Sequence, residues 1–239
     1  MSATQRSLAY TAAIAAAWLA IHVGGILFWH FSLETAPIVA VLVLTQAWLS
    51  TGLFIIAHDC MHNSLAPGRP RLNRVIGTLS LGAYAGLSYA ALLPNHQAHH
   101  ARPGTADDPD FHAPAPRNPL AWFIGFFRGY YSHAQLLRIT LAAVIYMLLG
   151  ASLVNIAVFW AVPALIALVQ LFTFGTYLPH RHDDGGFADR HNARSNDWSP
   201  AVSLLTCFNF GAYHHEHHLH PDAPWWQLPE RRRGRQAPH

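Results

Sequence analysis

The sequence predicts an all-α integral membrane protein with about four transmembrane helices and additional re-entrant or interfacial helices. Hydrophobic residues make up 52% of the 239-residue chain and charged residues only 11%, which is unusual for a water-soluble domain of this length. The apolar residues form long blocks rather than amphipathic stripes. All fifteen basic residues are arginines, and none lies in the turns predicted on one side of the membrane.

Four apolar blocks, each nearly free of charge, are long enough to cross about 30 Å of hydrocarbon as helices. They cover residues 8–29, 37–57, 136–153 and 156–178. Buried helices of a soluble bundle are the alternative, but those would need polar faces at 3.6-residue spacing. The first block could also be a signal peptide, although its length favours a retained helix. We expect a single membrane-embedded domain over residues 1–239.

Two further segments are predicted to stay at the interface. Residues 75–93 are apolar, but glycines, serines and tyrosines interrupt them. A single crossing there would separate the histidines that follow this segment from those that precede it, so we predict a re-entrant or interfacial hairpin. The aromatic run Trp122 to Tyr131, interrupted by Arg128, predicts an amphipathic helix that lies on the membrane.

Charge predicts the orientation. The turns around Glu34 and Ser152 contain no arginine, so the positive-inside rule places both termini on the cytoplasmic side of the cell inner membrane. No arginine stripe is interleaved with aromatics in a soluble module, which argues against a nucleic acid partner. The two cysteines, Cys60 and Cys207, lie on or near the cytoplasmic side and do not suggest a disulfide scaffold.

The chain has eighteen histidines, and nine of them form three clusters that begin at His58, His96 and His214. Their spacing of three and four residues places several imidazoles on one helical face. Eight imidazoles exceed what a structural zinc needs and fit two metal ions better. The eight are His58, His62, His96, His99, His100, His214, His217 and His218. Lone histidines such as His22 and His30 are interpreted as packing or interfacial residues.

A ninth ligand could come from the membrane boundary at the end of the last apolar block. His180 is the first candidate there, and His182 is the competitor because it would face the same side of an extended segment. All clusters can meet on one side of the membrane, since the hairpin 136–178 crosses twice before the third cluster begins. The sequence therefore predicts a histidine-rich metal site at the cytoplasmic surface.

The order HxxxH, HxxHH and HxxHH, with an apolar hairpin before the last, resembles the membrane fatty acid desaturase and hydroxylase superfamily. Within this superfamily, the sequence is most similar in its motifs to the bacterial beta-carotene ketolases. The similarity covers most of the chain beyond about residue 40. The matching stretches are residues 57–70, 99–111, 171–182 and 203–228. The most specific one is Pro-Gly-Thr-Ala-Asp-Asp-Pro-Asp-Phe at 103–111.

This resemblance implies a non-haem di-iron oxygenase that uses O2 and electrons from a reduced ferredoxin-type donor. The implied reaction turns C4 of a beta-ionone ring into a ketone through two hydroxylations and loss of water. It would convert beta-carotene to echinenone and canthaxanthin, with zeaxanthin to astaxanthin as a further conversion. Iron suits this reaction because, unlike zinc, it changes redox state and activates O2. The resemblance implies nine iron ligands, namely the eight histidines above and His180.

Acidic residues beside the ligands could accept hydrogen bonds from the imidazoles, although a solvated loop cap is an alternative for each aspartate. These candidates are Asp59, Asp107, Asp108, Asp110 and Glu216. Aromatic residues near the cytoplasmic helix ends could line a slot for a rigid polyene, and interfacial anchoring explains them equally well. They are Phe172, Phe174, Tyr177, Trp225 and Trp226.

Three other functions fit parts of the pattern. A carotenoid 3-hydroxylase shares the iron chemistry and differs in its product. A lipid desaturase or alkane hydroxylase shares the histidine clusters but not the specific stretches. A metal transporter would place its ligands near the bilayer midplane, whereas these clusters lie at one surface.

Overall fold

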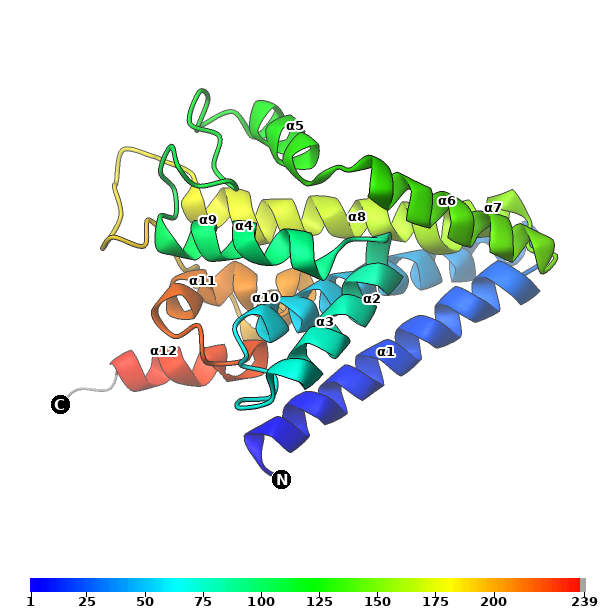
Figure 1. Ribbon diagram of the computed structural model, residues 1–239, viewed down its shortest axis with the longest axis horizontal. Coiled ribbons are helices and arrows are strands. Elements are labelled where there is room, and N and C mark those ends of the chain that lie inside the picture. The colour runs from blue at the N-terminus through cyan, green and yellow to red at the C-terminus, as the bar shows by residue number, and fades with distance from the viewer. Residues whose placement is uncertain (237–239) are drawn as a thin grey trace.

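A computed structural model of the chain describes residues 1–236, and these residues form helices and connecting loops without strands. The all-α fold class is therefore confirmed. Figure 1 shows the long helices running along the long axis of the molecule, with several short helices gathered at the end that holds the C-terminus.

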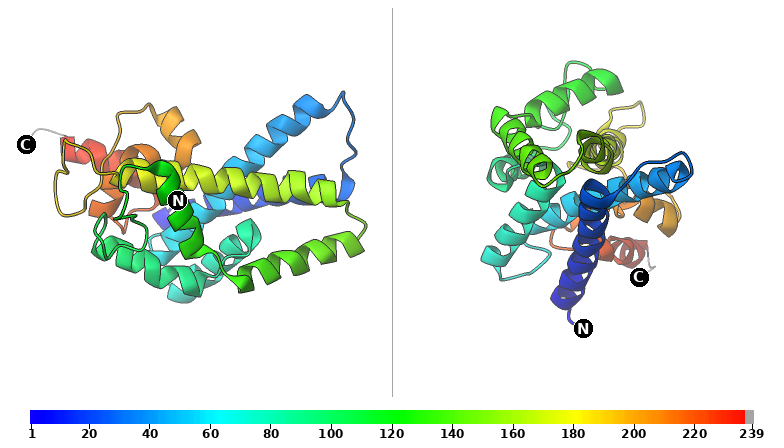
Figure 2. Two further views of the ribbon diagram at one scale, coloured as in Figure 1. Left: turned by 90° about the horizontal axis from the view of Figure 1, so that it is seen from above. Right: turned by 90° about the vertical axis from the view of Figure 1, so that its right-hand side faces the viewer.

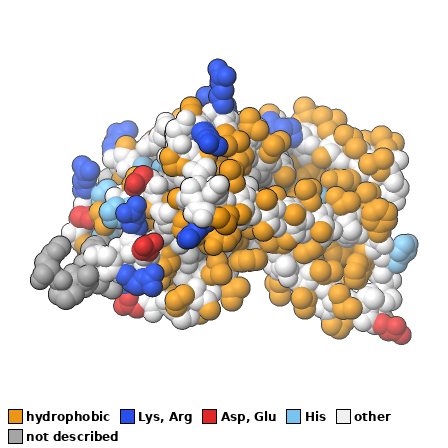
Figure 3. All heavy atoms as spheres, turned by 90° about the horizontal axis from the view of Figure 1, so that it is seen from below, with side chains coloured by type: hydrophobic (Ala, Val, Ile, Leu, Met, Phe, Trp, Pro, Cys, Tyr) orange, Lys and Arg blue, Asp and Glu red, His pale blue; other side chains and the backbone are white. Residues whose placement is uncertain are grey.

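Three described helical stretches are long and apolar enough to cross a membrane. They are α1 (Ala3–Phe28), α2 (Ala36–Met61) and the continuous stretch Leu153–His180. The last contains α7 (Leu153–Ile156), α8 (Val162–Leu171) and α9 (Leu178–His180), joined by π-helical turns at Ala157–Ala161 and Phe172–Tyr177. Apolar side chains cover much of the face in Figure 3, while charged side chains gather toward one end. This distribution is typical of a membrane protein.

The helix before this stretch, α6 (His133–Leu148), is shorter than the predicted block 136–153. Residues 149–152 form a turn in which Gly150 has a φ of +95°, a conformation that favours glycine. The Ser152 side chain then accepts a hydrogen bond from the Asn155 N–H and starts the next helix. The helical stretches here are therefore His133–Leu148 and Leu153–His180. The predicted membrane-crossing bounds, 136–153 and 156–178, stay a prediction.

The segment predicted to be re-entrant consists of two helices, α3 (Pro70–Ala85) and α4 (Tyr89–Ala101), whose axes differ by 102°. Gly86 ends α3 in the left-handed region with a φ of 63°, and Ser88 caps the start of α4. In Figure 1, α4 leads the chain back toward the end with the short helices. If the bent pair were one span, the chain would have four candidate spans; that it does not span stays a prediction.

Most of the remaining helices lie toward the end of the bundle that holds the C-terminus, as the left view of Figure 2 shows. They are α5 (Pro119–Tyr130), α10 (Pro200–Cys207), α11 (Phe210–Leu219), the 3-10 turn Trp225–Gln227 and α12 (Leu228–Gln236). The aromatic run predicted as an interfacial helix corresponds to α5, with Trp122 buried and Arg128 exposed.

The core centres on α2, which packs against α1, α3 and α8. Its polar residues form hydrogen bonds inside the bundle, such as Trp18 Nε1 to Ser50 Oγ at 3.0 Å and Thr51 Oγ1 to Gln170 Oε1 at 2.7 Å. Such pairing offsets the cost of burying polar groups. α2 continues as a buried helix to Met61, and this extension positions the first histidine cluster.

Candidate metal centre

Four helices bring the nine predicted ligands together at one end of the molecule. The last turns of α2 carry His58 and His62, and α9 ends with His180. Helix α4 carries the second cluster and α11 the third. In each cluster, the three- and four-residue spacing directs the imidazoles to a common side, as the sequence predicted.

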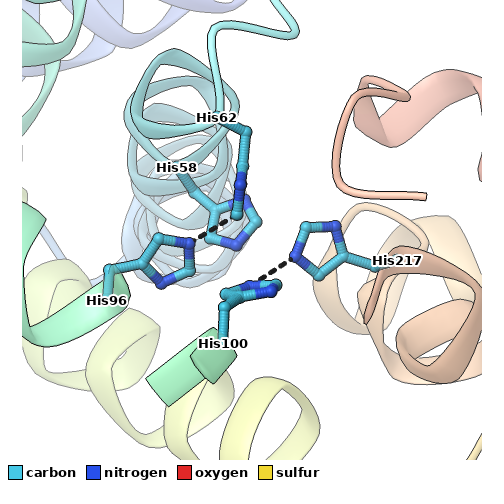
Figure 4. A group of neighbouring side chains, drawn as sticks. All are labelled: His58, His62, His96, His100 and His217. Atoms are coloured by element: carbon cyan, nitrogen blue, oxygen red, sulfur yellow. Dashed lines mark hydrogen bonds between the residues drawn. The ribbon is translucent and has the colours of Figure 1, made fainter. Parts of the chain in front are cut away.

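The first group contains five histidines whose candidate ligand atoms lie within 4.8 Å of one another. Figure 4 shows them pointing toward a common centre from three directions. The Nε2 atoms of His62 and His96 are 2.6 Å apart, and those of His100 and His217 are 3.0 Å apart. The ring of His58 completes the group, 4.6 Å from that of His217 between ring centroids.

The second group contains His99, His180, His214 and His218, all buried and within the same 4.8 Å limit. The Nε2 atom of His214 lies 2.8 Å from that of His180 and 3.1 Å from that of His218. The two groups adjoin, since the rings of His100 and His218 stack with centroids 4.4 Å apart. Together the groups contain all nine histidines predicted as ligands.

The spacing of these nitrogens fits metal ions. Nitrogens bound at about 2.1 Å and at right angles to one another lie about 3 Å apart, which is close to the Nε2 separations in both groups. Two facing Nε2 atoms of neutral imidazoles can share at most one hydrogen bond, in which one of them carries the proton. A metal ion would instead bind the lone pair of each Nε2, so metal coordination accounts for the convergence of these nitrogens.

The imidazoles of α11 are kept in the form that binds metals. Burial lowers the pKa of His214, His217 and His218 well below its usual range, and the surrounding imidazoles lower it further. These side chains are therefore neutral near pH 7, with a nitrogen lone pair available for coordination.

Two of the candidate ligands, His99 and His180, are oriented by hydrogen bonds on the side away from the centre. His99 Nδ1 donates to the Asp108 carboxylate, with both oxygens at 3.0 Å. Asp108 also accepts the backbone N–H groups of Gly104 at 2.7 Å and Asp110 at 2.8 Å. Burial alone would raise the pKa of Asp108, but these hydrogen bonds hold it below its ordinary value. His180 Nδ1 likewise donates to the Asn192 carbonyl at 2.8 Å, so Nε2 of both rings faces inward.

The other acidic candidates differ in their position. Asp59 lies 3.7 Å from His58 Nδ1 and accepts the Trp225 N–H at 3.0 Å. Asp110 Oδ2 lies 3.9 Å from His99 Nδ1, and the Asp110 carboxylate accepts a hydrogen bond from the Tyr130 hydroxyl. Buried Glu216, on the ligand helix α11, accepts a hydrogen bond from the Ser195 hydroxyl.

Asp107 and His182 lie outside the two groups. Asp107 is exposed and forms an ion pair with Arg102 at 2.8 Å, so it belongs to the loop surface. His182 Nε2 lies 3.0 Å from the Gly104 carbonyl, an interaction that fastens one loop to another. Of the two candidates for a ninth ligand, the structure thus brings only His180 into a group of histidines.

An apolar cavity of about 410 Å³ adjoins the histidines. It is lined by histidines of both groups, by Asp110 and Tyr130, and otherwise mainly by apolar residues of α2, α5, α6 and α8. The five aromatic residues predicted to line a slot do not occur among its described lining residues. Phe172 stacks on Tyr177, Phe174 packs on Trp198, Trp225 packs on Phe208, and Trp226 donates to Ser7.

Several residues that contact the histidine groups or the cavity were not predicted from the sequence. Asn192 acts through its backbone carbonyl, which no residue-type pattern reveals. Tyr130 was treated only as part of an interfacial helix, although it contacts Asp110 at the cavity wall. His215 lies outside both groups, and its Nε2 is 2.8 Å from Asp189; its place beside the ligand His214 gave no signal of that separate role.

The fold and the site define a helical membrane protein with two adjoining groups of buried histidines suited to metal ions. The profile of the fatty acid desaturase family matches residues 33–141 and 130–238, and the chain belongs to this family.

The chain is 48% identical over 231 residues to a protein named beta-carotene ketolase from Paracoccus sp. (strain N81106 / MBIC 01143), which covers 96% of this chain and 93% of that protein. A beta-carotene ketolase from Haematococcus lacustris is 38% identical over 82% of this chain and 62% of its own length. An omega-6 fatty acid desaturase from Glycine max is 32% identical over 46% of this chain and 27% of its own length.

Proposed function

We propose that the chain is a membrane-bound di-iron oxygenase that converts the C4 methylene of the beta-ionone rings of beta-carotene into a ketone. The observation that carries this proposal is the convergence of nine histidines at the end of an apolar cavity. Identity of 48% to a beta-carotene ketolase over nearly the whole chain supports the substrate and the reaction. We assign the nine histidines as the iron ligands.

Each ring requires two hydroxylations at one carbon. Together they consume two O2, four electrons and four protons, and the resulting geminal diol loses water, so that one methylene becomes one ketone and three waters form. Bound iron would supply the activation of O2. The electrons come from a reduced ferredoxin-type donor, which we propose docks at the end of the molecule where the arginines and the histidine groups lie.

The protein's own residues position the reactants. Asp108 and the Asn192 carbonyl hold the Nδ1 protons of His99 and His180, which fixes the direction of their Nε2 atoms. The apolar cavity wall keeps bulk water away from the reacting carbon. Asp59, Asp110 and Glu216 are proposed to support ligand helices in the same way.

We also propose the membrane arrangement. α1, α2, α6 and the stretch Leu153–His180 cross the cell inner membrane, whereas the bent pair α3–α4 enters and returns. Both termini and the metal site then lie on the cytoplasmic side. The arginine-free turns at the other end support this orientation.

The test is expression in a bacterium engineered to accumulate beta-carotene, followed by chromatography and mass spectrometry of the extracted pigments. The expected product has lost four hydrogens and gained two oxygens, and its absorption shifts to that of a red keto-carotenoid. A C3 alcohol as the sole product would indicate a carotenoid hydroxylase. Altered acyl chains with unchanged carotenoid would indicate a lipid desaturase or hydroxylase.

A further inference from the structure

Helix α6 lies at the edge of the bundle and has hydrogen bonds to other helices near both of its ends. All its residues are described and none is buried. Near its start, Gln135 Nε2 donates to the Ala85 carbonyl at 2.9 Å and Arg138 Nε to the Gly86 carbonyl at 2.7 Å. Near its other end, the Tyr146 hydroxyl lies 3.0 Å from His22 Nε2. Between these points, Ile139 and Ala143 of α6 pack against the edge of the core and also form a wall of the cavity.

The cavity follows one stripe of the stretch Leu153–His180 from the histidines toward the opposite side of the bundle. The lining residues recur every three to four positions, as expected for one helical face. The stripe consists of Ile156, Trp160, Ala164, Leu168, Leu171 and Gly175. At about 1.5 Å per residue, and somewhat less in the π-helical turns, it is roughly 25–30 Å long.

The cavity also opens sideways. Leu136 on α6 and Leu165 on α8 both line it, yet they are 50% and 58% exposed. Phe127 and Tyr131, at the junction of α5 and α6, combine exposure with the same lining position. In a bilayer, these exposed apolar residues face lipid, so a greasy molecule can reach the cavity without passing through water.

Resting on the proposed function, we propose that the carotenoid enters from the bilayer between α6 and α8 and lies along α8. Its reacting ring contacts the histidine end, and its opposite ring lies beside Trp160, Ile156 and Ala143. The length of the stripe is close to that of a fully extended carotenoid, which is about the thickness of the hydrocarbon core, ~30 Å. A rigid polyene also loses less conformational entropy in a straight groove than a flexible acyl chain does.

The far end of the groove provides the test. Ala143→Phe and Ala161→Phe each place a ring in the space assigned to the distal ring of the carotenoid. Ala143 is half-buried and Ala161 is exposed, so we expect both variants to fold. Val169→Phe is the matched control, because Val169 is exposed on α8 and does not line the cavity. Ketone formation is measured in membranes supplied with a reduced ferredoxin, with beta-carotene and with a half-length polyene that carries one beta-ionone ring.

The two groove variants should lower kcat/KM for beta-carotene by about tenfold or more, while the half-length compound is affected less than about twofold and bound iron is unchanged. A loss on beta-carotene that is confined to the groove variants and spares the half-length compound supports the proposal. If the unaltered chain does not convert the half-length compound, the comparison of the groove variants with Val169→Phe on beta-carotene decides. Full activity of both groove variants on beta-carotene, or equal losses on both substrates, overturns it. If one groove variant loses iron, the result of the other groove variant decides whether the proposal holds. Absence of any ketone from the unaltered chain would instead overturn the proposed function, and this proposal with it.

Discussion

The hydrogen bond between His99 and Asp108 shows how a single carboxylate can organise the site. It fixes which ring nitrogen of His99 carries the proton, and the other nitrogen then faces the second histidine group. Asp108 is itself held by two backbone N–H groups, so neither side chain can rotate independently. Hydrogen-bond partners of this kind commonly influence metal affinity as strongly as some ligands do.

Replacing Asp108 by Asn is expected to lower iron content and ketone formation by about 10–100-fold, because the amide cannot accept all the hydrogen bonds that the carboxylate accepts. Asp107→Asn is the matched control, since Asp107 is exposed and forms its ion pair with Arg102 on the loop surface. Iron is measured by elemental analysis of the purified protein. Equal iron and activity in both variants would contradict the role assigned to Asp108.

His180 and His182 give a second test at the scale of residues. His180→Ala removes a member of the four-histidine group and should abolish iron-dependent activity. His182→Ala removes loop contacts with the Gly104 carbonyl and with the rings of Phe111 and Phe187, and it should retain bound iron. The same elemental analysis and pigment assay distinguish the two, and loss of iron from the His182 variant alone would reverse the assignment.

Much of this site could be predicted because side chains three and four residues apart in a helix point to the same side. Within each histidine cluster, the imidazoles point to a common side, as their three- and four-residue intervals predict. The difference between Asp107 and Asp108 could not be predicted, since turn geometry alone decides which of two adjacent carboxylates faces inward. The contribution of Asn192 was equally inaccessible, because every residue type carries a backbone carbonyl.

Among the elements, helix ends and π-helical turns account for the differences from the predictions. The apolar pattern continues past Leu148, but the turn at Gly150 ends α6. In the turn Phe172–Tyr177, the additional residue per turn rotates the side chains that follow. Phe172 and Tyr177 therefore pack beside Trp122, while Gly175 and Thr176 face the cavity.

The bent pair α3–α4 makes a topological prediction. Cysteines introduced by Arg71→Cys in the first turn of α3 and by Ala106→Cys after α4 should react with an impermeant thiol reagent from the same side of the membrane. Both positions are exposed, and the native Cys60 and Cys207 are buried, so background labelling should be low. Labelling from opposite sides would show that the pair crosses the membrane.

In the whole molecule, the two histidine groups connect α2, α4, α9 and α11. Removing the metals should therefore lower the melting temperature of the detergent-solubilised protein, because binding free energy that stabilises only the folded state is lost. Readdition of ferrous iron should restore the melting temperature. An unchanged melting temperature after complete chelation would mean that the helices hold the site without metal.

Membrane insertion should be independent of this centre. His99→Ala and His217→Ala are expected to lack iron and ketone formation but to remain in the membrane fraction, since the apolar helices that anchor the chain do not include these residues. Fractionation followed by immunodetection measures this directly. Full activity of either variant would contradict the ligand assignment.

The location of both histidine groups at one end of the cavity has a consequence for a substrate with two identical ends. Only one end can reach the histidines at a time, and no second set of ligands lies at the other end of the groove among the described residues. With the carotenoid bound as proposed, a singly oxidised molecule would have to leave, turn end over end in the bilayer and return before its second half reacts. Because the new carbonyl would then cross the hydrocarbon, we expect this half-turn to be slower than the first encounter, so that singly oxidised pigment accumulates ahead of the final product.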